Sequence, residues 1–216
     1  MKWIFWDNDG VLVDTEHLYL EATRGAIADT GFELTDELYQ EFFLRQNLGI
    51  WHLIEGFTED ALQVLKEKRN GLYAQLLQAG SLVIPGAIET LKALAPTYRM
   101  GIVTSSQPAH FDIIHRSTGI LDLLEFAITP DFYTNSKPSP DPYLKALELS
   151  GAHPTDCLVI EDSERGLAAA KAAGIECWVI PSRLTNEMEF AGADRKLGSI
   201  TELPSALRTS RFSSAS

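Results

Sequence analysis

Short apolar segments alternate with amphipathic segments along most of this sequence, and this alternation constrains the fold more than any other feature. Apolar segments of buried-strand length lie at residues 3–6, 100–103, 126–128, 158–160 and 177–180. Helical patterns lie at residues 86–95, 108–118, 141–150 and 163–173. Strands that alternate with helices predict an α/β fold, with a doubly wound, mainly parallel sheet and right-handed crossovers.

Residues 16–80 break this alternation, because they carry helical signals with no convincing strand between them. Thr35 and Asp36 are typical of a helix start, and a longer amphipathic helix is predicted after Thr58. We therefore expect an all-helical cap at residues 16–80, inserted into a core that consists of residues 1–15 and 81–205. Two short linkers would join the cap to the core and permit hinge motion. The Ser-rich end, residues 206–216, is expected to be a disordered tail.

Composition and charge exclude several classes of function. The chain has 216 residues, enough for one large domain or one domain with an insertion, and 45% of them are hydrophobic. Its 18 Lys and Arg against 30 Asp and Glu give a net charge of −12, which makes nucleic acid and anionic membranes poor partners. No apolar segment reaches the length of a signal or spanning helix, so a cytoplasmic location is expected. Cys157 and Cys177 lie in apolar segments and are expected to be buried, unreactive thiols of a reducing compartment.

Polar side chains follow four of the predicted strands, at the edge where an open α/β sheet binds its ligand. In strand order they are Asp7 and Asp9, then Thr104 and Ser105, then Lys137, and finally Glu161 with Asp162. Carboxylates gathered at one edge repel one another unless a cation joins them. Because their ligand atoms are hard oxygens, Mg²⁺ is the expected ion.

The pair Asp7 and Asp9 provides two carboxylates for two chemical roles, and both side chains leave an extended chain on the same side. One carboxylate can attack phosphorus to form an aspartyl-phosphate. The other can pass a proton to the leaving oxygen and later take one from water. A hydroxyl at Thr104 or Ser105 and the ammonium of Lys137 would stabilise the phosphoryl oxygens, so these residues predict phosphoryl transfer.

The same segments resemble the four ordered motifs of the haloacid dehalogenase-like (HAD) hydrolase superfamily. They read DNDGVLVDT at 7–15, VTSS at 103–106, SKPSPD at 136–141 and IEDS at 160–163. From residue 3 to about residue 182 the chain is most similar to the branch that contains phosphoglycolate phosphatase and β-phosphoglucomutase. Members of this branch have a Rossmann-like core and a helical cap inserted after the first motif.

This resemblance implies a role for each matching residue. Asp7 would be the nucleophile and a ligand of the metal, and Asp9 the general acid and base with its backbone carbonyl on the metal. Thr104 and Lys137 would complete the catalytic set and bind phosphate. Ser105 is expected to bind phosphate as well. The Mg²⁺ site would be completed by Asp162, with Glu161 helping directly or through water. Asp14 and Thr15 are expected to be structural.

Differences between this chain and other branches of the superfamily indicate which reaction it catalyses. Dehalogenases of the superfamily lack an equivalent of Asp9, and its phosphonate hydrolases use a cap lysine, whereas this chain has no Lys between Lys2 and Lys66. Mutases that resemble β-phosphoglucomutase use a cap histidine, where this chain has Tyr19, and a cap arginine that is absent from residues 46–50.

We therefore predict a monomeric, Mg²⁺-dependent phosphatase acting on a small phosphorylated metabolite, such as a sugar phosphate, a polyol phosphate or phosphoglycolate. A hexose-phosphate mutase is the alternative enzyme, because His17, Arg24 and Arg45 lie close to the expected mutase positions. The non-enzymatic alternative is a phosphate-binding regulatory module. The complete catalytic set argues against this module, since a binder needs neither a nucleophile nor an acid.

Overall fold

The computed structural model describes residues 2–213 and contains a six-stranded parallel sheet in the order β3-β2-β1-β4-β5-β6. The strands are β1 (Trp3–Trp6), β2 (Arg99–Val103), β3 (Phe126–Ile128), β4 (Cys157–Glu161), β5 (Glu176–Val179) and β6 (Arg195–Lys196). In this register Trp6 lies opposite Ile102 on one side and Ile160 on the other. The strands therefore end together at one edge, and the predicted doubly wound α/β fold is confirmed.

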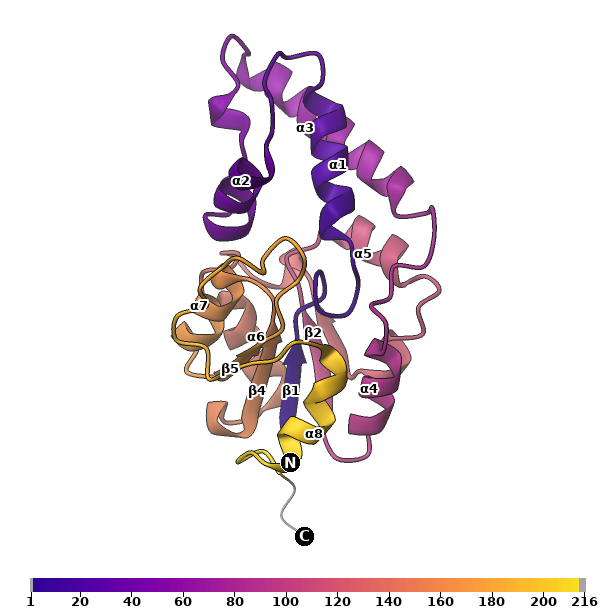
Figure 1. Ribbon diagram of the computed structural model, residues 1–216, viewed down its shortest axis with the longest axis vertical. Coiled ribbons are helices and arrows are strands. Elements are labelled where there is room, and N and C mark those ends of the chain that lie inside the picture. Colours follow the sequence, from indigo (N-terminus) through magenta and orange to yellow (C-terminus); the bar gives the residue numbers. More distant parts are fainter. Residues whose placement is uncertain (1, 214–216) are drawn as a thin grey trace.

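Helices cover both faces of the sheet, because alternate side chains of β1 enter two different cores. The helices are α4 (Ala87–Leu94), α5 (Pro108–His115), α6 (Asp141–Ser150), α7 (Glu164–Ala172) and α8 (Leu203–Arg208). Ile4 and Trp6 pack with residues of α4, α5 and α8, whereas Trp3 and Phe5 pack with residues of α6 and α7. Figure 1 shows α6 and α7 on one side of the sheet and α4 on the other.

The chain between β1 and α4 forms a separate group of helices above the ends of the strands (Figure 1). This group contains α1 (Glu16–Ile27), α2 (Asp36–Tyr39), a π-helical turn (Gln40–Arg45), a 3-10 turn (Trp51–Leu53) and α3 (Glu59–Leu76). The Thr35 and Thr58 hydroxyls accept the N–H groups of Leu38 and Ala61, both at 3.2 Å, and so cap α2 and α3. We call residues 16–80 the cap and the rest the core, while the two boundaries themselves stay a prediction.

The C-terminal segment differs from the sequence expectation. The predicted disordered tail at 206–216 is wrong for residues 206–213, because α8 continues to Arg208 and Phe212 is only 1% exposed. The Tyr98 hydroxyl donates to the carbonyl of Phe212 at 2.7 Å, and Lys2 donates to the carbonyl of Arg211. Apolar burial thus orders a segment whose composition is polar. Residues 214–216 lie outside the described residues.

The two cysteines lie where the apolar pattern places them. Cys157 and Cys177 are buried free thiols in β4 and β5, and burial raises the pKa of both. A raised thiol pKa leaves little reactive thiolate at neutral pH. None of the helices within residues 2–213 is long and apolar enough to cross a membrane.

Candidate active site

The loop after β1 turns sharply, and this turn shapes one wall of the site. Gly10 has a φ of +86°, in the left-handed region that favours glycine. The carbonyl of Asn8 accepts the N–H groups of residues 11–13, which anchors the loop. A Cβ at Gly10 would lie 2.1 Å from Oδ2 of Asp162. Only glycine therefore allows the Asp162 carboxylate to approach this loop.

Lys137 joins the ends of three strands through its buried ammonium group. Its Nζ donates to Oδ1 of Asp7 at 2.7 Å, to Oε1 of Glu161 at 2.6 Å and to the carbonyl of Val103 at 2.9 Å. Burial lowers the pKa of Lys137, but Asp7 and Glu161 outweigh it and raise that pKa above its ordinary value. The side chain therefore stays charged and supplies a fixed positive charge at the sheet edge.

Glu161 uses both of its oxygens within the protein. Oε1 accepts from Lys137 and from the hydroxyl of Tyr143 at 2.7 Å, and Oε2 accepts from Ser163 Oγ at 3.1 Å and from the Asp162 N–H at 3.2 Å. Burial raises the pKa of Glu161, but Lys137 outweighs burial and the net shift is downward. With four donors on one carboxylate, the geometry favours Glu161 as the group that holds Lys137 and assists a metal indirectly.

The carboxylates beside Lys137 fit a hard divalent cation. Oxygens of Asp7, Glu161 and Asp162 all lie within 4.8 Å of one another, and Oδ2 of Asp162 is buried with no hydrogen-bond partner among the described residues. Burial, with the charge of Glu161, raises the pKa of Asp7 to about 7. Burial, with Asp7 and Glu161, raises the pKa of Asp162 well above its ordinary value. A cation would relieve this repulsion and provide a partner for the Asp162 oxygen, so the residues fit Mg²⁺.

Asp9 is surrounded by hydroxyl donors. Its Oδ1 accepts from Thr15 at 2.5 Å, and its Oδ2 accepts from Ser106 at 2.6 Å and from Thr104 at 3.2 Å. The Thr104 hydroxyl also accepts the N–H of Ser106 at 3.0 Å, so both of its functions are used within the protein. The Ser105 Oγ, in contrast, is buried and has no partner among residues 2–213. Ser105 is thus the hydroxyl available to a phosphoryl oxygen.

Sequence reasoning missed two of these groups. Thr15 was expected to be structural, and its hydroxyl holds the Asp9 carboxylate; Ser106 was assigned no role at all. Ser106 follows the two residues that the motif singled out, so its position carried a signal. Which hydroxyl contacts Asp9 and which is left free depends on side-chain rotamers, which the motif does not specify.

A cleft of about 550 Å³ lies between the cap and the ends of the strands. Its core side includes Asp7, Asp9, Ser105, Lys137, Asp162 and Arg165, and its cap side includes Glu16, Tyr19, Asn47 and Arg69. The structure thus brings Asp7, Asp9, Ser105, Lys137 and Asp162 together at one cleft, while Thr104 and Glu161 support these groups from behind.

Polar contacts cross from the cap to the core at the rim of this cleft. Arg165 donates to Oδ1 of Asn47 at 2.7 Å, and Arg45 pairs with Glu164 at 3.1 Å. On α5, the His110 ring lies 3.2 Å from the carbonyl of Asn70 in α3. Arg165 lies in the first turn of helix α7, two residues after the fourth motif, but no motif position marks it, so sequence reasoning missed it. These contacts hold the cap over the site.

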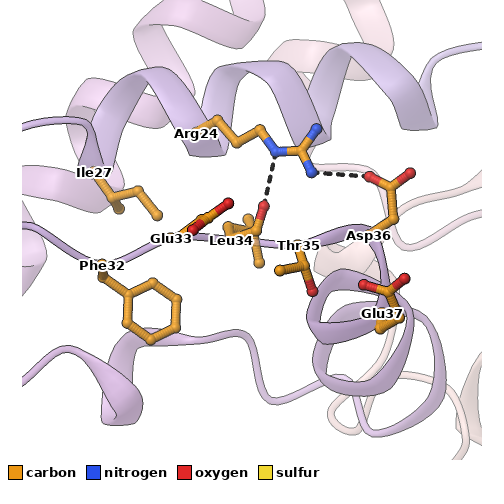
Figure 2. Close-up of a pocket in the computed structure, with 8 residues that line it drawn as sticks. All are labelled: Arg24, Ile27, Phe32, Glu33, Leu34, Thr35, Asp36 and Glu37. Carbon is orange, nitrogen blue, oxygen red and sulfur yellow. Dashed lines mark hydrogen bonds and ion pairs between the residues drawn. The ribbon is translucent and has the colours of Figure 1, made fainter.

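A second cavity, of about 590 Å³, lies within the cap and carries none of the predicted site residues (Figure 2). There Arg24 donates to the carbonyl of Leu34 and to Asp36, both at 2.8 Å. Figure 2 shows the guanidinium turned toward these two partners. Because this arginine is already paired and lies outside the catalytic cleft, we assign the chemistry to the cleft. His17 and Arg45 are likewise absent from the described lining of that cleft, which weakens the mutase alternative.

Comparison with known proteins decides the family. The family model described as a hydrolase, haloacid dehalogenase-like hydrolase, matches residues 1–174. The chain belongs to the haloacid dehalogenase-like hydrolase family.

Similar proteins extend this likeness over nearly the whole chain. Protein CbbY of Rhodobacter capsulatus is 29% identical over 215 residues, which cover 91% of this chain and 92% of that protein. A phosphorylated carbohydrates phosphatase of Thermotoga maritima is 30% identical, with coverage of 82% and 83%. The crystal structure of a CbbY variant from Rhodobacter sphaeroides, in complex with xylulose-(1,5)bisphosphate, aligns with a TM-score of 0.80 and 27% identity and covers 94% of this chain and 96% of that one. The predicted branch of the superfamily and the predicted enzyme class, a phosphatase, are confirmed.

Proposed function

We propose that this HAD-like phosphatase is Mg²⁺-dependent and hydrolyses a small phosphorylated sugar or polyol through an aspartyl-phosphate on Asp7. One observation carries the proposal: the buried ammonium of Lys137 binds both Asp7 and Glu161, and the unpartnered oxygen of Asp162 lies beside them. This arrangement places three groups at one edge of the sheet: a nucleophile, a fixed positive charge and an acceptor oxygen that has no hydrogen-bond donor among the described residues.

Phosphoryl transfer to the enzyme uses Asp7 and Asp9 together. Lys137 holds Asp7 by Oδ1, which leaves Oδ2 to form a bond to phosphorus while the bond from phosphorus to the alcohol oxygen breaks. Asp9 gives its proton to that leaving oxygen. The Ser105 hydroxyl, which has no partner among residues 2–213, donates to a phosphoryl oxygen. Lys137, whose three donors are held by Asp7, Glu161 and the carbonyl of Val103, acts through its fixed positive charge, which stabilises the negative charge of the phosphoryl oxygens. When bound to Asp7, Asp162 and the Asp9 carbonyl, Mg²⁺ supplies further positive charge for these oxygens.

Hydrolysis of the aspartyl-phosphate then uses Asp9 in the opposite direction. Asp9, now ionised, takes a proton from water as the water oxygen attacks phosphorus, and the bond from phosphorus to Asp7 breaks to release phosphate. Contacts such as that between Arg165 and Asn47 hold the cap over the cleft and exclude bulk water. Opening of the cap releases the alcohol and the phosphate.

The cap side of the cleft supports a hydroxyl-rich leaving group. Glu16 is half-buried, accepts the hydroxyl of Tyr39 at 2.6 Å and lines the cleft together with Asn47 and Arg165. Carboxylate, amide and guanidinium groups together can accept from and donate to the hydroxyls of a sugar or polyol. Two of the similar proteins are also named for, or crystallised with, phosphorylated carbohydrates, which agrees with this chemistry.

Phosphate release from a panel of phosphorylated metabolites tests the proposal. We expect turnover with Mg²⁺, loss of turnover with a chelator, and no turnover by Asp7→Asn. Asp112→Asn is the matched control, because Asp112 is exposed on α5 and outside the cleft. Turnover by Asp7→Asn would contradict the nucleophile assignment. Conversion of α- or β-glucose 1-phosphate to glucose 6-phosphate without free phosphate would instead identify a mutase.

The monomeric state and the cytoplasmic location stay predictions. Light scattering on the purified full chain measures its mass in solution, and a mass near 23.9 kDa is expected for a monomer.

A further inference from the structure

A buried polar pair lies directly behind the carboxylates. His115, the last residue of α5, is 6% exposed, and Asn8, between Asp7 and Asp9, is fully buried. The Nε2 of His115 lies 2.8 Å from Oδ1 of Asn8, and its Nδ1 lies 3.0 Å from Oγ1 of Thr118. No motif includes His115, and the phosphatase mechanism above uses neither side chain.

The contacts give this chain of hydrogen bonds one direction. An amide oxygen only accepts, so Nε2 of His115 carries the proton and donates to Asn8. The bare Nδ1 then accepts from the Thr118 hydroxyl. Burial lowers the pKa of His115 to about 4, which agrees with a neutral ring. Because its oxygen is taken by His115, the amide of Asn8 directs its Nδ2 to Oδ2 of Asp9, at 3.3 Å.

The opposite orientation of Asn8 is disfavoured by the same geometry. Oδ2 of Asp9 already accepts the hydroxyls of Ser106 and Thr104, so with the amide reversed the Asn8 oxygen would face another acceptor without a proton between them. The backbone of Asn8 cannot relieve this contact, because its carbonyl already accepts the N–H groups of residues 11–13. The contacts with His115 and with Asp9 therefore fix the amide together, with its oxygen toward the ring and its Nδ2 toward Asp9.

We propose that His115 and Asn8 are positioning residues for Asp9, the acid that protonates the leaving group. This inference rests on the proposed function. Two buried polar side chains add little stability compared with an apolar pair of similar shape, so their arrangement points to a role in orientation. A looser Asp9 would deliver its proton less effectively, while the attack by Asp7 would remain intact.

The dependence of rate on the leaving group separates positioning from simple structural support. An ester of a poor leaving group needs a proton from the acid, whereas an ester of a good one does not. Phenyl, 4-nitrophenyl and 2,4-dinitrophenyl phosphate have similar shapes and increasingly good leaving groups. The ratio kcat/KM reports the steps through formation of the aspartyl-phosphate, so it is the quantity to measure.

The main variant is the double substitution Asn8→Leu with His115→Leu, which removes the whole polar pair and leaves no buried group without a partner. We expect its kcat/KM to fall about tenfold more for phenyl phosphate than for 2,4-dinitrophenyl phosphate, a fraction of the effect of a complete general acid. His115→Gln, whose amide can still donate to Asn8, should restore most of the wild-type dependence. Ile114→Val, a packing change in the same helix, is the control and should lower the three esters equally if it lowers them at all.

The outcomes distinguish this inference from the proposed function. A leaving-group dependence that steepens in the double variant and recovers in His115→Gln supports positioning. Equal losses for all three esters in a folded double variant would overturn positioning and leave the phosphatase assignment intact. If the double variant does not fold, single substitutions replace it. Thr118→Val removes only the donor to Nδ1 of His115, and His115→Leu removes the ring. An unchanged leaving-group dependence in Thr118→Val, His115→Gln and His115→Leu alike would overturn the positioning role. Absence of Mg²⁺-dependent turnover by the wild-type protein with any phosphate ester would overturn both.

Discussion

Acidification from about pH 7 to about pH 5 is expected to destabilise the folded protein through His115. Burial lowers the pKa of this ring from 6.5 to about 4, and the charge of Asp9 opposes burial only in part. Between these values the unfolded chain binds a proton that the folded chain does not. The stabilisation is therefore complete above pH 6.5 and is lost as the pH falls toward 4. At about 1.4 kcal/mol per pH unit, the full loss in the free energy of unfolding is about 3 kcal/mol, and about 2 kcal/mol of this loss is expected by about pH 5.

Urea unfolding measures this loss directly. The free energy of unfolding would be determined at several pH values for the wild-type protein and for the double variant Asn8→Leu with His115→Leu, with the fluorescence of the buried residues Trp6 and Trp178 as the signal. The carboxylates titrate in both proteins, so the difference between the two pH profiles isolates His115. Between about pH 7 and about pH 5 the wild-type protein should lose about 2 kcal/mol more than the variant. Parallel profiles would refute the reasoning, because they would mean that His115 has the same pKa in the folded and unfolded chains.

Three further substitutions test other parts of the site. Lys137→Met should abolish phosphate release and lower the free energy of unfolding by about 3 kcal/mol or more, because Asp7 and Glu161 would stay buried without their shared cation; wild-type stability in urea would contradict this. Gly166→Ala would place a Cβ 2.0 Å from the carboxyl carbon of Glu161. It should displace that carboxylate at a cost of about 1–3 kcal/mol and lower kcat, and an unchanged kcat would contradict the crowding argument. Arg165→Leu should raise KM for the preferred sugar phosphate about tenfold and change KM for 4-nitrophenyl phosphate by less than about twofold, since the guanidinium reaches from the core to Asn47 of the cap, where the leaving group is expected; equal changes in both would count against that placement.

Local pattern was enough to predict five of the six strands that the structure describes, β6 being the exception, and to place the candidate site residues at one edge of the sheet. Buried parallel strands are apolar on both faces, so their positions are visible in the sequence without any knowledge of their partners. Parallel strands also place their carboxyl ends at one edge, which is why Asp7, Lys137 and Asp162 could be expected to meet although they are distant in sequence. The ordered motifs then carried the superfamily assignment, and the family match over residues 1–174 confirms it.

The C-terminal segment shows where composition misleads. Residues 206–213 are rich in small polar side chains, yet Phe212 enters the core and its carbonyl accepts the hydroxyl of Tyr98, which lies 114 positions away. The energy that orders this segment comes from apolar surface that another part of the fold provides. A prediction from the segment alone has no access to that surface.

The sequence by itself determined which chemical groups gather at the sheet edge, because strand periodicity and motif order are local properties of the chain. Only the tertiary structure decided how those groups are used. It showed that Glu161 receives four hydrogen bonds, that Thr104 contacts Asp9 while Ser105 has no partner among the described residues, and that His115 contacts Asn8 from 107 residues away. Such assignments depend on rotamers and on packing between distant elements, which a motif does not encode.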